Sequence, residues 1–361
     1  MILLDGSYGE GGGQILRTAL SLSVFTKQSF EIKNIRASRP NPGLKAQHLA
    51  CIKSAAQLCN AIVFGAQIGS THLIFEPKDI NKTKIEIDIG TAGAITLLLQ
   101  AILLPAFFHK KSISFKITGG TDVEWSPQIN YFQEVFLPHI KKYCAKIDVK
   151  LIKRGYYPAG AGEVIIKIKP KIFATQNDVE KQLLANAPKI ILEEQGSLMF
   201  IKGISHACAN LFESGVAQNQ AASAIEFLKK KFSCPINITT EYSKSQSLGF
   251  GICLWAIFSK IKDDIDVYNP IILGADVIGK DVSEKNTGLK CAQMLEKTIK
   301  SGFAVDNYLA DQLIPWIALI KGSKIKPAAL TPHLKANIYA TELFLGKCIK
   351  INEKENIIES F

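Results

Sequence analysis

The stretch Asp5-Gly-Ser-Tyr-Gly-Glu-Gly-Gly-Gly-Gln-Ile-Leu-Arg17 leads into the first helical pattern of the chain and decides how its fold is interpreted. This pattern runs from Gly13 to Phe25 and is entered through glycines. Its start, Gly13-Gln14-Ile15, is echoed by Gly93-Ala94-Ile95, which opens a second apolar helix 80 residues further on. A repeat of this kind indicates repeated α/β units in place of one doubly wound sheet.

The segments that follow alternate between strand and helix patterns. Residues Phe30 to Ile35 predict a strand, and residues Gly43 to Asn60 predict a helix. The helix carries one apolar face, made of Leu44, Ile52, Ala55 and Cys59. The first third of the chain is therefore predicted to be a mixed α/β structure.

From about Leu184 the pattern changes to a β-α-β-β block. Its predicted elements are Ser197–Ile204, Gln218–Phe232, Pro235–Tyr242 and Gly249–Phe258. A long helix then begins near Ser283 and ends near Ser301. We expect residues 184–269 to form a small inserted α/β domain, and residues 1–183 and 270–361 to form a larger, discontinuous domain.

The apolar stretches and the first residues of the chain indicate where the protein acts. The longest apolar stretch, Ala94 to Phe108, is broken by Gln100 and Pro105 and is shorter than the roughly 20 residues of a membrane span. The first residues lead directly into a strand and a glycine loop, without the charged and apolar regions of a signal peptide. We therefore expect a cytoplasmic protein that has no membrane partner.

The charged residues and the cysteines narrow the class of partner. The chain has 43 Lys and Arg against 32 Asp and Glu, a net charge of +11, which favours anionic partners such as nucleic acid. Its eight cysteines contain no Cys-x-x-Cys pair, and no histidine stands at ligand spacing from one. We expect reduced, mostly buried thiols, with neither a zinc site nor a disulfide framework.

The glycine loop at residues 9–13 is a candidate anion site. Consecutive glycines let backbone amides approach a phosphate, and the helix that starts near Gly13 directs its N-terminal amides at the same point. The loop is not a Walker loop, because no Gly-Lys-Ser/Thr follows it. Glu10 would repel a phosphate unless a divalent cation lay between them, so it indicates a metal. A glycine turn with a solvated Glu explains the same residues.

A basic loop follows the predicted strand at Phe30 to Ile35. Arg36 and Arg39 lie just before Pro40-Asn41-Pro42-Gly43, and Gln47 lies on the next helical turn. Two arginines held there can clamp phosphates through bidentate hydrogen bonds. An exposed, solvated basic loop is the alternative.

His333 is the candidate nucleophile among six histidines. It follows Thr331-Pro332 in a loop, and Asn337 lies about one helical turn further on, where its side chain can orient the imidazole. A neutral imidazole is a competent nucleophile towards phosphorus. A surface or capping histidine is the alternative.

A third cluster presents polar and aromatic groups together. Tyr308, Asp311 and Gln312 stand at positions i, i+3 and i+4 and share one helical face, which suits a purine base. A tyrosine packed at a domain or subunit edge is the alternative.

Taken together, the motifs resemble the RNA 3'-terminal phosphate cyclase family. The matching strings run nearly end to end: Gly-Glu-Gly-Gly-Gly-Gln-Ile-Leu-Arg (9–17), Ile-Arg-Ala-Ser-Arg-Pro (35–40), Gly-Leu-Lys-Ala-Gln-His (43–48), Gly-Gly-Thr-Asp (119–122), Gly-Tyr-Tyr-Pro-Ala-Gly-Ala-Gly (155–162), Leu-Ala-Asp-Gln-Leu (309–313) and His-Leu-Lys-Ala-Asn (333–337). Each string is weak alone, and their order makes the resemblance specific.

The resemblance implies a fold and a reaction. The fold is an α/β (α+β) domain of repeated βαβαββ units, similar to the enolpyruvyl transferases, with a small thioredoxin-like insert. In the family, the histidine that matches His333 attacks the α-phosphate of ATP and forms a covalent His-AMP. The AMP then passes to an RNA 3'-phosphate, and the neighbouring 2'-OH displaces it to close a 2',3'-cyclic phosphate.

The resemblance also assigns the other site residues. Tyr308 and Pro127 match residues that sandwich adenine, and Asp311 and Gln312 match residues near the nucleoside. Glu10 matches a residue near the ribose and a divalent cation, Mg²⁺ or Mn²⁺. The remaining matches lie around phosphates or the RNA end, and they are Gln14, Arg17, Arg36, Arg39, Gln47 and Gln100.

Two other functions share this fold pattern. One branch of the family has lost the nucleophile and serves ribosome assembly as a non-catalytic protein, an alternative that the presence of His333 disfavours. The enolpyruvyl transferases act on unrelated substrates, and similarity of fold does not choose between these functions.

Overall fold

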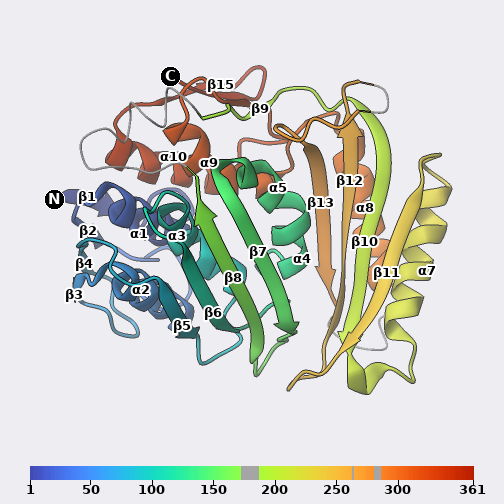
Figure 1. Cartoon of the computed structure of the whole chain (residues 1–361), viewed down its shortest axis with the longest axis horizontal. Coiled ribbons are helices and arrows are strands. Elements are labelled where there is room, and N and C mark those ends of the chain that lie inside the picture. Colours follow the sequence, from blue (N-terminus) through green and yellow to red (C-terminus); the bar gives the residue numbers. More distant parts are fainter. Residues whose placement is uncertain (172–186, 262–263, 280–285) are drawn as a thin grey trace.

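The computed structural model describes residues 1–171, 187–261, 264–279 and 286–361. Four mixed β-sheets surround or flank helices, so the predicted mixed α/β class is confirmed (Figure 1). Most of the predicted site residues lie in the first turns of helices or in the loops that join helices to strands, so the order of these elements positions the site.

The first sheet is built from the N-terminal residues. Its elements are β1 (Ile2–Asp5), α1 (Gln14–Thr26), β2 (Phe30–Lys33), α2 (Ala46–Cys59), β3 (Ile62–Phe64) and β4 (Leu73–Glu76). The strand order is β1-β2-β4-β3, and β1 and β2 are parallel with Leu4 opposite Ile32. The glycine loop crosses from β1 to α1.

The second sheet repeats these connections. Its elements are β5 (Lys84–Asp88), α3 (Ile95–Phe107), β6 (Ile113–Gly119), α4 (Ile129–Tyr131), the π-helix η1 (Phe132–Phe136), α5 (Leu137–Ile140), the 3-10 turn η2 (Lys141–Tyr143), β7 (Cys144–Lys153) and β8 (Gly162–Pro170). The order is β5-β6-β8-β7, with Ile87 of β5 opposite Ile117 of the parallel strand β6. The helices that open near Gly13 and Gly93 thus hold equivalent places.

A third sheet has the same connections but is interrupted. Its elements are β9 (Ile191–Leu192), α9 (Asn307–Leu319), β14 (Lys324–Ile325), α10 (Pro332–Leu345), β15 (Ile349–Asn352) and β16 (Ile357–Ser360). The order is β15-β16-β14-β9, and β9 and β14 are parallel. The chain between β9 and α9 forms a separate layer.

We call that layer the inserted unit. Its elements are β10 (Ser197–Cys208), the 3-10 turn η3 (Ala209–Leu211), α7 (Val216–Lys229), β11 (Ile236–Ser243), β12 (Phe250–Ser259), β13 (Ile271–Ile278) and α8 (Thr287–Lys300). The strand order is β11-β10-β12-β13, and α7 and α8 both contact the sheet. The sheet therefore continues past Asn269 through β13.

The division of the chain into domains stays a prediction. The expected boundary at Leu184 and the helix start near Ser283 lie outside the described residues. Because β9 pairs with β14 and β13 pairs with β12, we propose that the inserted unit covers residues 197–300. The enolpyruvyl-transferase-like and thioredoxin-like descriptions of the two parts also stay predictions.

Helices from the three repeated stretches form one core. α1 contacts α2, α3 and α10, and residues such as Ile15, Leu20 and Ile102 are completely buried there. Full burial of one such side chain stabilises the fold by about 1.5–3 kcal/mol. The stretch Ala94 to Phe108 is the buried helix α3, as predicted. Among the described residues, no helix is long and apolar enough to cross a membrane.

Candidate functional site

The glycine loop brings the backbone close to the start of α1. Gly9 and Gly11 have φ values of +61° and +56°, which only glycine adopts at little cost. A Cβ at Gly13 would lie 2.1 Å from Nε2 of His48, so this position has no room for a side chain. Among the residues that the structure describes, no side chain caps α1, and its first turn has no acidic residue. The positive end of the helix is therefore open to an anion.

His333 joins this loop to the third repeated stretch. It lies in the first turn of α10, where Thr331 caps the helix by accepting a hydrogen bond from the Leu334 N–H at 3.0 Å. Its Nδ1 contacts Oε1 of Gln14, at the start of α1. Its Nε2 lies 2.9 Å from Oε2 of Glu10. The N-terminal ends of α1 and α10 thus meet at one imidazole.

Arg39 completes the group around the imidazole. Its guanidinium lies 3.1 Å from the same Glu10 oxygen. A Cβ at Gly12 would lie 3.5 Å from Arg39 and 3.7 Å from Cε1 of His333. The structure thus gathers Glu10, Gln14, Arg39 and His333, four of the residues that the sequence predicted for the site.

Burial and nearby charge favour a neutral imidazole. Removal from water lowers the pKa of His333 below its ordinary value of 6.5, and Arg17 and Arg39 act in the same direction. Glu10 opposes them. A lowered pKa leaves His333 unprotonated at neutral pH, as a nucleophile requires.

The predicted contact between Asn337 and His333 is wrong. Asn337 donates from Nδ2 to the backbone oxygen of Asp311 at 2.6 Å and accepts from the Thr18 hydroxyl at 2.5 Å. These bonds tie α10 to α9 and α1. The residue that contacts Nδ1 of His333 is Gln14, which lies 319 residues away in the sequence.

Two further predicted residues pair behind the loop. Arg17 is only 8% exposed, and its Nε donates to Oε1 of Gln100 at 2.9 Å. This bond joins α1 to α3. It also leaves the other N–H groups of the guanidinium for an anion.

Arg36 and Gln47 have different surroundings. One terminal nitrogen of Arg36 donates to the backbone oxygens of Asn41 and Gly43, at 2.7 and 3.0 Å, so this arginine holds its own loop together. Nε2 of Gln47 is buried and has no hydrogen-bond partner among the described residues. A buried amide without a partner is costly, and a bound group would satisfy it.

The proposed base-binding residues lie at the start of α9. Tyr308 is 49% exposed and packs edge-on against Tyr131, with ring centroids 6.1 Å apart at 82°. Nε2 of Gln312 donates to the Tyr308 backbone oxygen at 3.0 Å. Asp311 accepts from Thr331 at 3.3 Å, and burial raises the pKa of Asp311 to about 7. The α9 cluster therefore adjoins the helix that carries His333.

Pro127 lies in the loop before α4. It is buried, and its backbone oxygen accepts from the Thr96 hydroxyl at 2.7 Å. A cavity of about 30 Å³ lies between α1, α3, α9 and α10, and its lining includes Gln100, Asp311 and Gln312. That volume holds only water, so this cavity is too small for a nucleotide.

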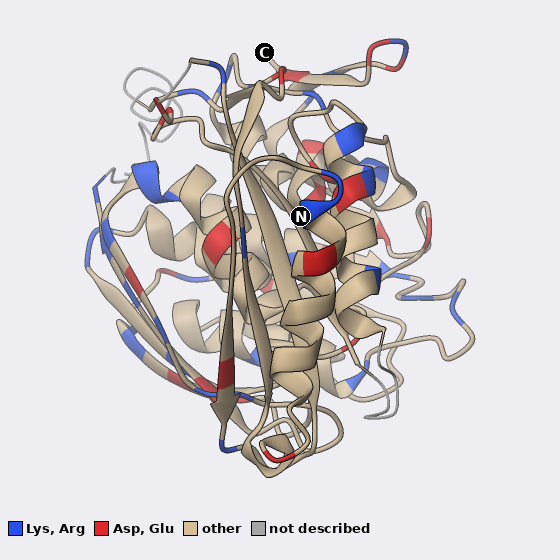
Figure 2. Cartoon of the chain, turned by 90° about the vertical axis from the view of Figure 1, so that its right-hand side faces the viewer, with Lys and Arg blue, Asp and Glu red and all other residues tan. Residues whose placement is uncertain are grey.

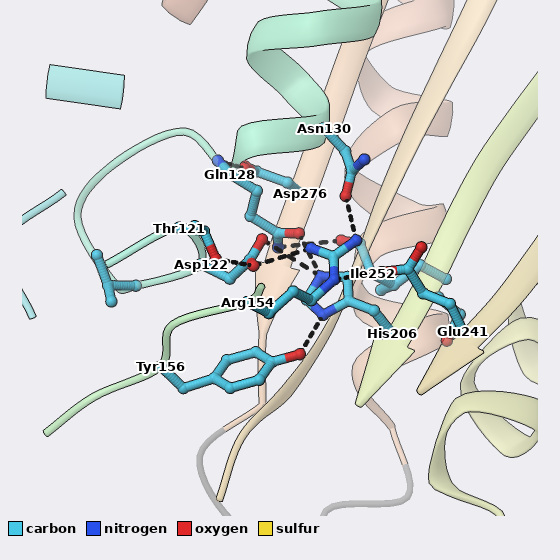
Figure 3. A network of polar contacts seen from close by, with 12 residues as sticks. Thr121, Asp122, Gln128, Asn130, Arg154, Tyr156, His206, Glu241, Ile252 and Asp276 are labelled. Carbon is cyan, nitrogen blue, oxygen red and sulfur yellow. Dashed lines mark hydrogen bonds and ion pairs between the residues drawn. The ribbon is translucent and has the colours of Figure 1, made fainter. Parts of the chain in front are cut away.

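Sequence reasoning missed a buried polar network between the second sheet and the inserted unit (Figure 3). Arg154 contacts Asp122 at 2.8 Å, Asn130 at 2.6 Å and Glu241 at 2.5 Å. His206 lies between Tyr156 at 2.9 Å and Gln128 at 2.8 Å. Two of its members, Asp122 and Tyr156, lie in the matching strings at 119–122 and 155–162, and these strings were the available signal.

The charged residues of both signs are mixed along the chain. Figure 2 shows positions of lysine and arginine interspersed along the ribbon with those of aspartate and glutamate. Around His333 the positive field comes from particular groups, namely Arg17, Arg39 and the open N-terminal end of α1. A half-buried histidine beside such groups is typical of an enzyme site that acts on an anionic substrate.

Comparisons with known proteins give the family. The family model of the RNA 3'-terminal phosphate cyclases matches residues 8–351. A Pyrococcus furiosus protein with that name is 43% identical over 352 residues, which cover 97% of this chain and 95% of the relative. The RNA 3'-terminal phosphate cyclase of Methanosarcina mazei is 40% identical over 366 residues, covering 99% of each chain, and that of Archaeoglobus fulgidus is 37% identical over 361 residues, covering 99% of this chain and 100% of the relative. The chain belongs to the RNA 3'-terminal phosphate cyclase family.

Proposed function

We propose that this chain uses ATP to convert an RNA 3'-terminal phosphate into a 2',3'-cyclic phosphate, with His333 as the nucleophile. The observation that carries the proposal is the position of the imidazole. It lies between Gln14 and Glu10, where the N-terminal ends of α1 and α10 meet. Membership of the cyclase family supports the same reaction.

The first step is transfer of AMP to the enzyme. A neutral imidazole has one proton and can donate it either to Oε1 of Gln14 from Nδ1 or to Oε2 of Glu10 from Nε2; attack requires the tautomer that donates to Gln14, which leaves the lone pair on Nε2. Nε2 attacks the α-phosphorus of ATP, the bond from that phosphorus to the bridging oxygen breaks, and pyrophosphate leaves. The contact between Nε2 and the Glu10 carboxylate has to break before this attack, because Nε2 reacts on the side that faces Glu10.

The next two steps act on RNA. An oxygen of the RNA 3'-phosphate attacks the phosphorus of the enzyme-bound AMP, the P–N bond breaks, and RNA(3')pp(5')A forms. The 2'-hydroxyl then attacks the RNA phosphorus, AMP leaves, and the hydroxyl proton passes to water. The order is chemically necessary, because a terminal phosphate has no good leaving group until AMP is attached to it.

Phosphate groups are held by the open end of α1 and by basic and amide side chains around it. Arg17 and Arg39 supply charge beside His333. Gln47 brings a buried Nε2 that has no partner in the described part of the chain, and Gln100 orients Arg17. Arg36 contributes the N–H groups that its loop does not use.

The nucleoside is held by α9 and the loop before α4. We assign the adenine to the gap between Tyr308 and Pro127, and we place Asp311 and Gln312 near the nucleoside. The exposed Tyr308 ring suits stacking on a base, which contributes about 1–3 kcal/mol.

A divalent cation, Mg²⁺ or Mn²⁺, fits this site only together with ATP. Among the described residues, no three His, Cys, Asp or Glu side chains lie close enough together to hold a metal ion. Glu10 is the carboxylate beside His333, and Mg²⁺ is commonly held by one or two carboxylates plus substrate phosphates. Such an ion would neutralise phosphate charge during the reaction.

Labelling with ATP that carries a radioactive α-phosphate tests the proposal. The wild-type protein should retain acid-labile AMP, and His333→Ala should retain none. His72→Ala is the matched control, because His72 also contacts a carboxylate, that of Glu31 at 2.8 Å, but on another surface. The non-catalytic ribosome-assembly protein and the enolpyruvyl transferase both predict an unlabelled wild type. We further propose that the enzyme acts in the cytoplasm.

A further inference from the structure

The two proposed walls of the adenine site, Tyr308 and Pro127, belong to different segments of the chain. Both segments are held by the same strand of the inserted unit, β13. Each link is made by one acidic residue, Asp306 for the Tyr308 wall and Asp276 for the Pro127 wall.

Asp306 fixes the start of α9 against β13. It is 4% exposed and stands two residues before Tyr308, as the N-cap of that helix. Oδ1 accepts from the Leu309 N–H at 3.0 Å and from the Tyr131 hydroxyl at 2.6 Å. Oδ2 accepts from the Gly274 N–H of β13 at 3.0 Å. One carboxylate therefore joins β13, the helix of Tyr308 and the ring on which Tyr308 packs.

The approach of Tyr131 to β13 is unusually close. A Cβ at Gly274 would lie 2.4 Å from Cε2 of Tyr131, so the ring occupies the space of a missing side chain. Tyr131 supports Tyr308 edge-on. The position of the Tyr308 ring thus depends on the inserted unit through both its backbone and its neighbour.

Asp276 holds the other wall. It lies two residues after Gly274, and its Oδ2 accepts from the Gln128 backbone N–H at 2.6 Å (Figure 3). The Gln128 amide group donates to the backbone oxygens of Ile252 and Val277, at 3.3 and 3.1 Å. Pro127, the preceding residue, is thereby fixed to the inserted unit on one side and to Thr96 of α3 on the other.

We propose that β13 sets the position of Tyr308 relative to Pro127, with Asp306 and Asp276 as positioning residues for the adenine of ATP. The inference rests on the proposed function. It assigns the inserted unit a part in nucleotide recognition, although the assigned base-binding residues belong to the repeated stretches.

The test compares ATP with tripolyphosphate, which has the phosphates but no base. Asp306→Asn keeps an oxygen for the Leu309 N–H and the Tyr131 hydroxyl but turns an amide N–H towards the Gly274 N–H. Asp276→Ala removes the acceptor for Gln128. Binding is measured by calorimetry with magnesium present, in the His333→Ala background, so that no covalent step intervenes.

We expect the Kd for ATP to rise about tenfold in both variants, within the range that lost base stacking gives. The Kd for tripolyphosphate should stay within twofold. Glu241→Gln is the control, because Glu241 lies on β11, at the opposite edge of the same sheet, and contacts Arg154. It should leave both affinities unchanged.

Three outcomes would overturn the inference. Unchanged ATP affinity in both variants would remove the positioning role, and this result leaves the proposed function standing if the wild type labels with AMP. Equal losses for ATP and tripolyphosphate would show general damage to the site. If the wild-type protein binds no ATP and retains no AMP, both the inference and the proposed function fail.

Discussion

Gln14 should control the protonation state of His333, and two substitutions separate its possible effects. Gln14→Ala deletes the acceptor that faces Nδ1. One neutral hydrogen bond contributes about 1 kcal/mol net, so AMP transfer should slow about fivefold at every pH. The helix should remain intact, because alanine is a good helix former.

Gln14→Glu keeps the acceptor but adds a negative charge. A carboxylate beside the imidazole favours its protonated form, so the lowered pKa of His333 should rise in this variant. Protonated imidazole cannot attack phosphorus. The variant should therefore be slow at pH 7 and recover at higher pH, so that the acid limb of its pH–rate profile shifts upward.

The assay is single-turnover labelling with ATP between pH 5.5 and 9. Gln28→Ala is the matched control, because Gln28 bridges the other ends of the same two helices by donating to the Phe344 backbone oxygen at 3.1 Å. Its labelling rate should equal that of the wild type. Gln14 has no such role if Gln14→Ala labels at the wild-type rate and Gln14→Glu leaves the acid limb in place.

Three further outcomes are expected. Tyr308→Ala should raise the KM for ATP by about tenfold or more, because stacking on a base contributes about 1–3 kcal/mol, and Tyr308→Phe should retain most activity. An unchanged KM in initial-rate measurements of Tyr308→Ala would contradict the adenine assignment. Arg39→Ala should reduce the slope of log affinity for RNA 3'-phosphate against log salt concentration by about 0.7, as expected for one lost contact to a single strand. If a salt titration gives the same slope for the variant and the wild type, Arg39 does not make that contact. His139 is 1% exposed, neither ring nitrogen has a partner among the described residues, and burial lowers its pKa to about 3. Since the unfolded chain binds a proton near pH 6.5 and the folded protein does not, stability is lost as pH falls below 6.5, and His139→Leu should recover about 2 kcal/mol of that loss at pH 5. Urea unfolding at pH 5 and 7.5 measures this gain, and a loss at pH 5 as large as in the wild type would count against it.

Local patterns predicted the elements that hold the site. The helix expected at Gly13–Phe25 is Gln14–Thr26, and that expected at Gly43–Asn60 is Ala46–Cys59. The second begins later because Gly43 has a φ of +77° and its N–H bonds to the Ile35 oxygen, which keeps it in the preceding turn. The apolar periodicity of the sequence predicts the approximate length of a helix but not the contacts that fix its ends.

Long-range contacts could not be predicted in this way. Helical spacing placed Asn337 beside His333, but Thr18 and the Asp311 backbone compete for its side chain from other helices. Likewise, β13 follows the β-α-β-β block as an apolar run, and only its pairing with β12 shows that it belongs to the same sheet. The roles of the individual site residues stay predictions until they are tested.

The central claim is that His333 is needed to form the activated RNA end and not to close the cyclic phosphate. The direct measurement gives the His333→Ala enzyme two substrates, RNA 3'-phosphate with ATP, and RNA already activated as RNA(3')pp(5')A. We expect no cyclic phosphate from the first and a substantial part of the wild-type yield from the second. Cyclisation of the first substrate at the wild-type rate, or no cyclisation of the second by the variant when the wild type succeeds, would contradict it.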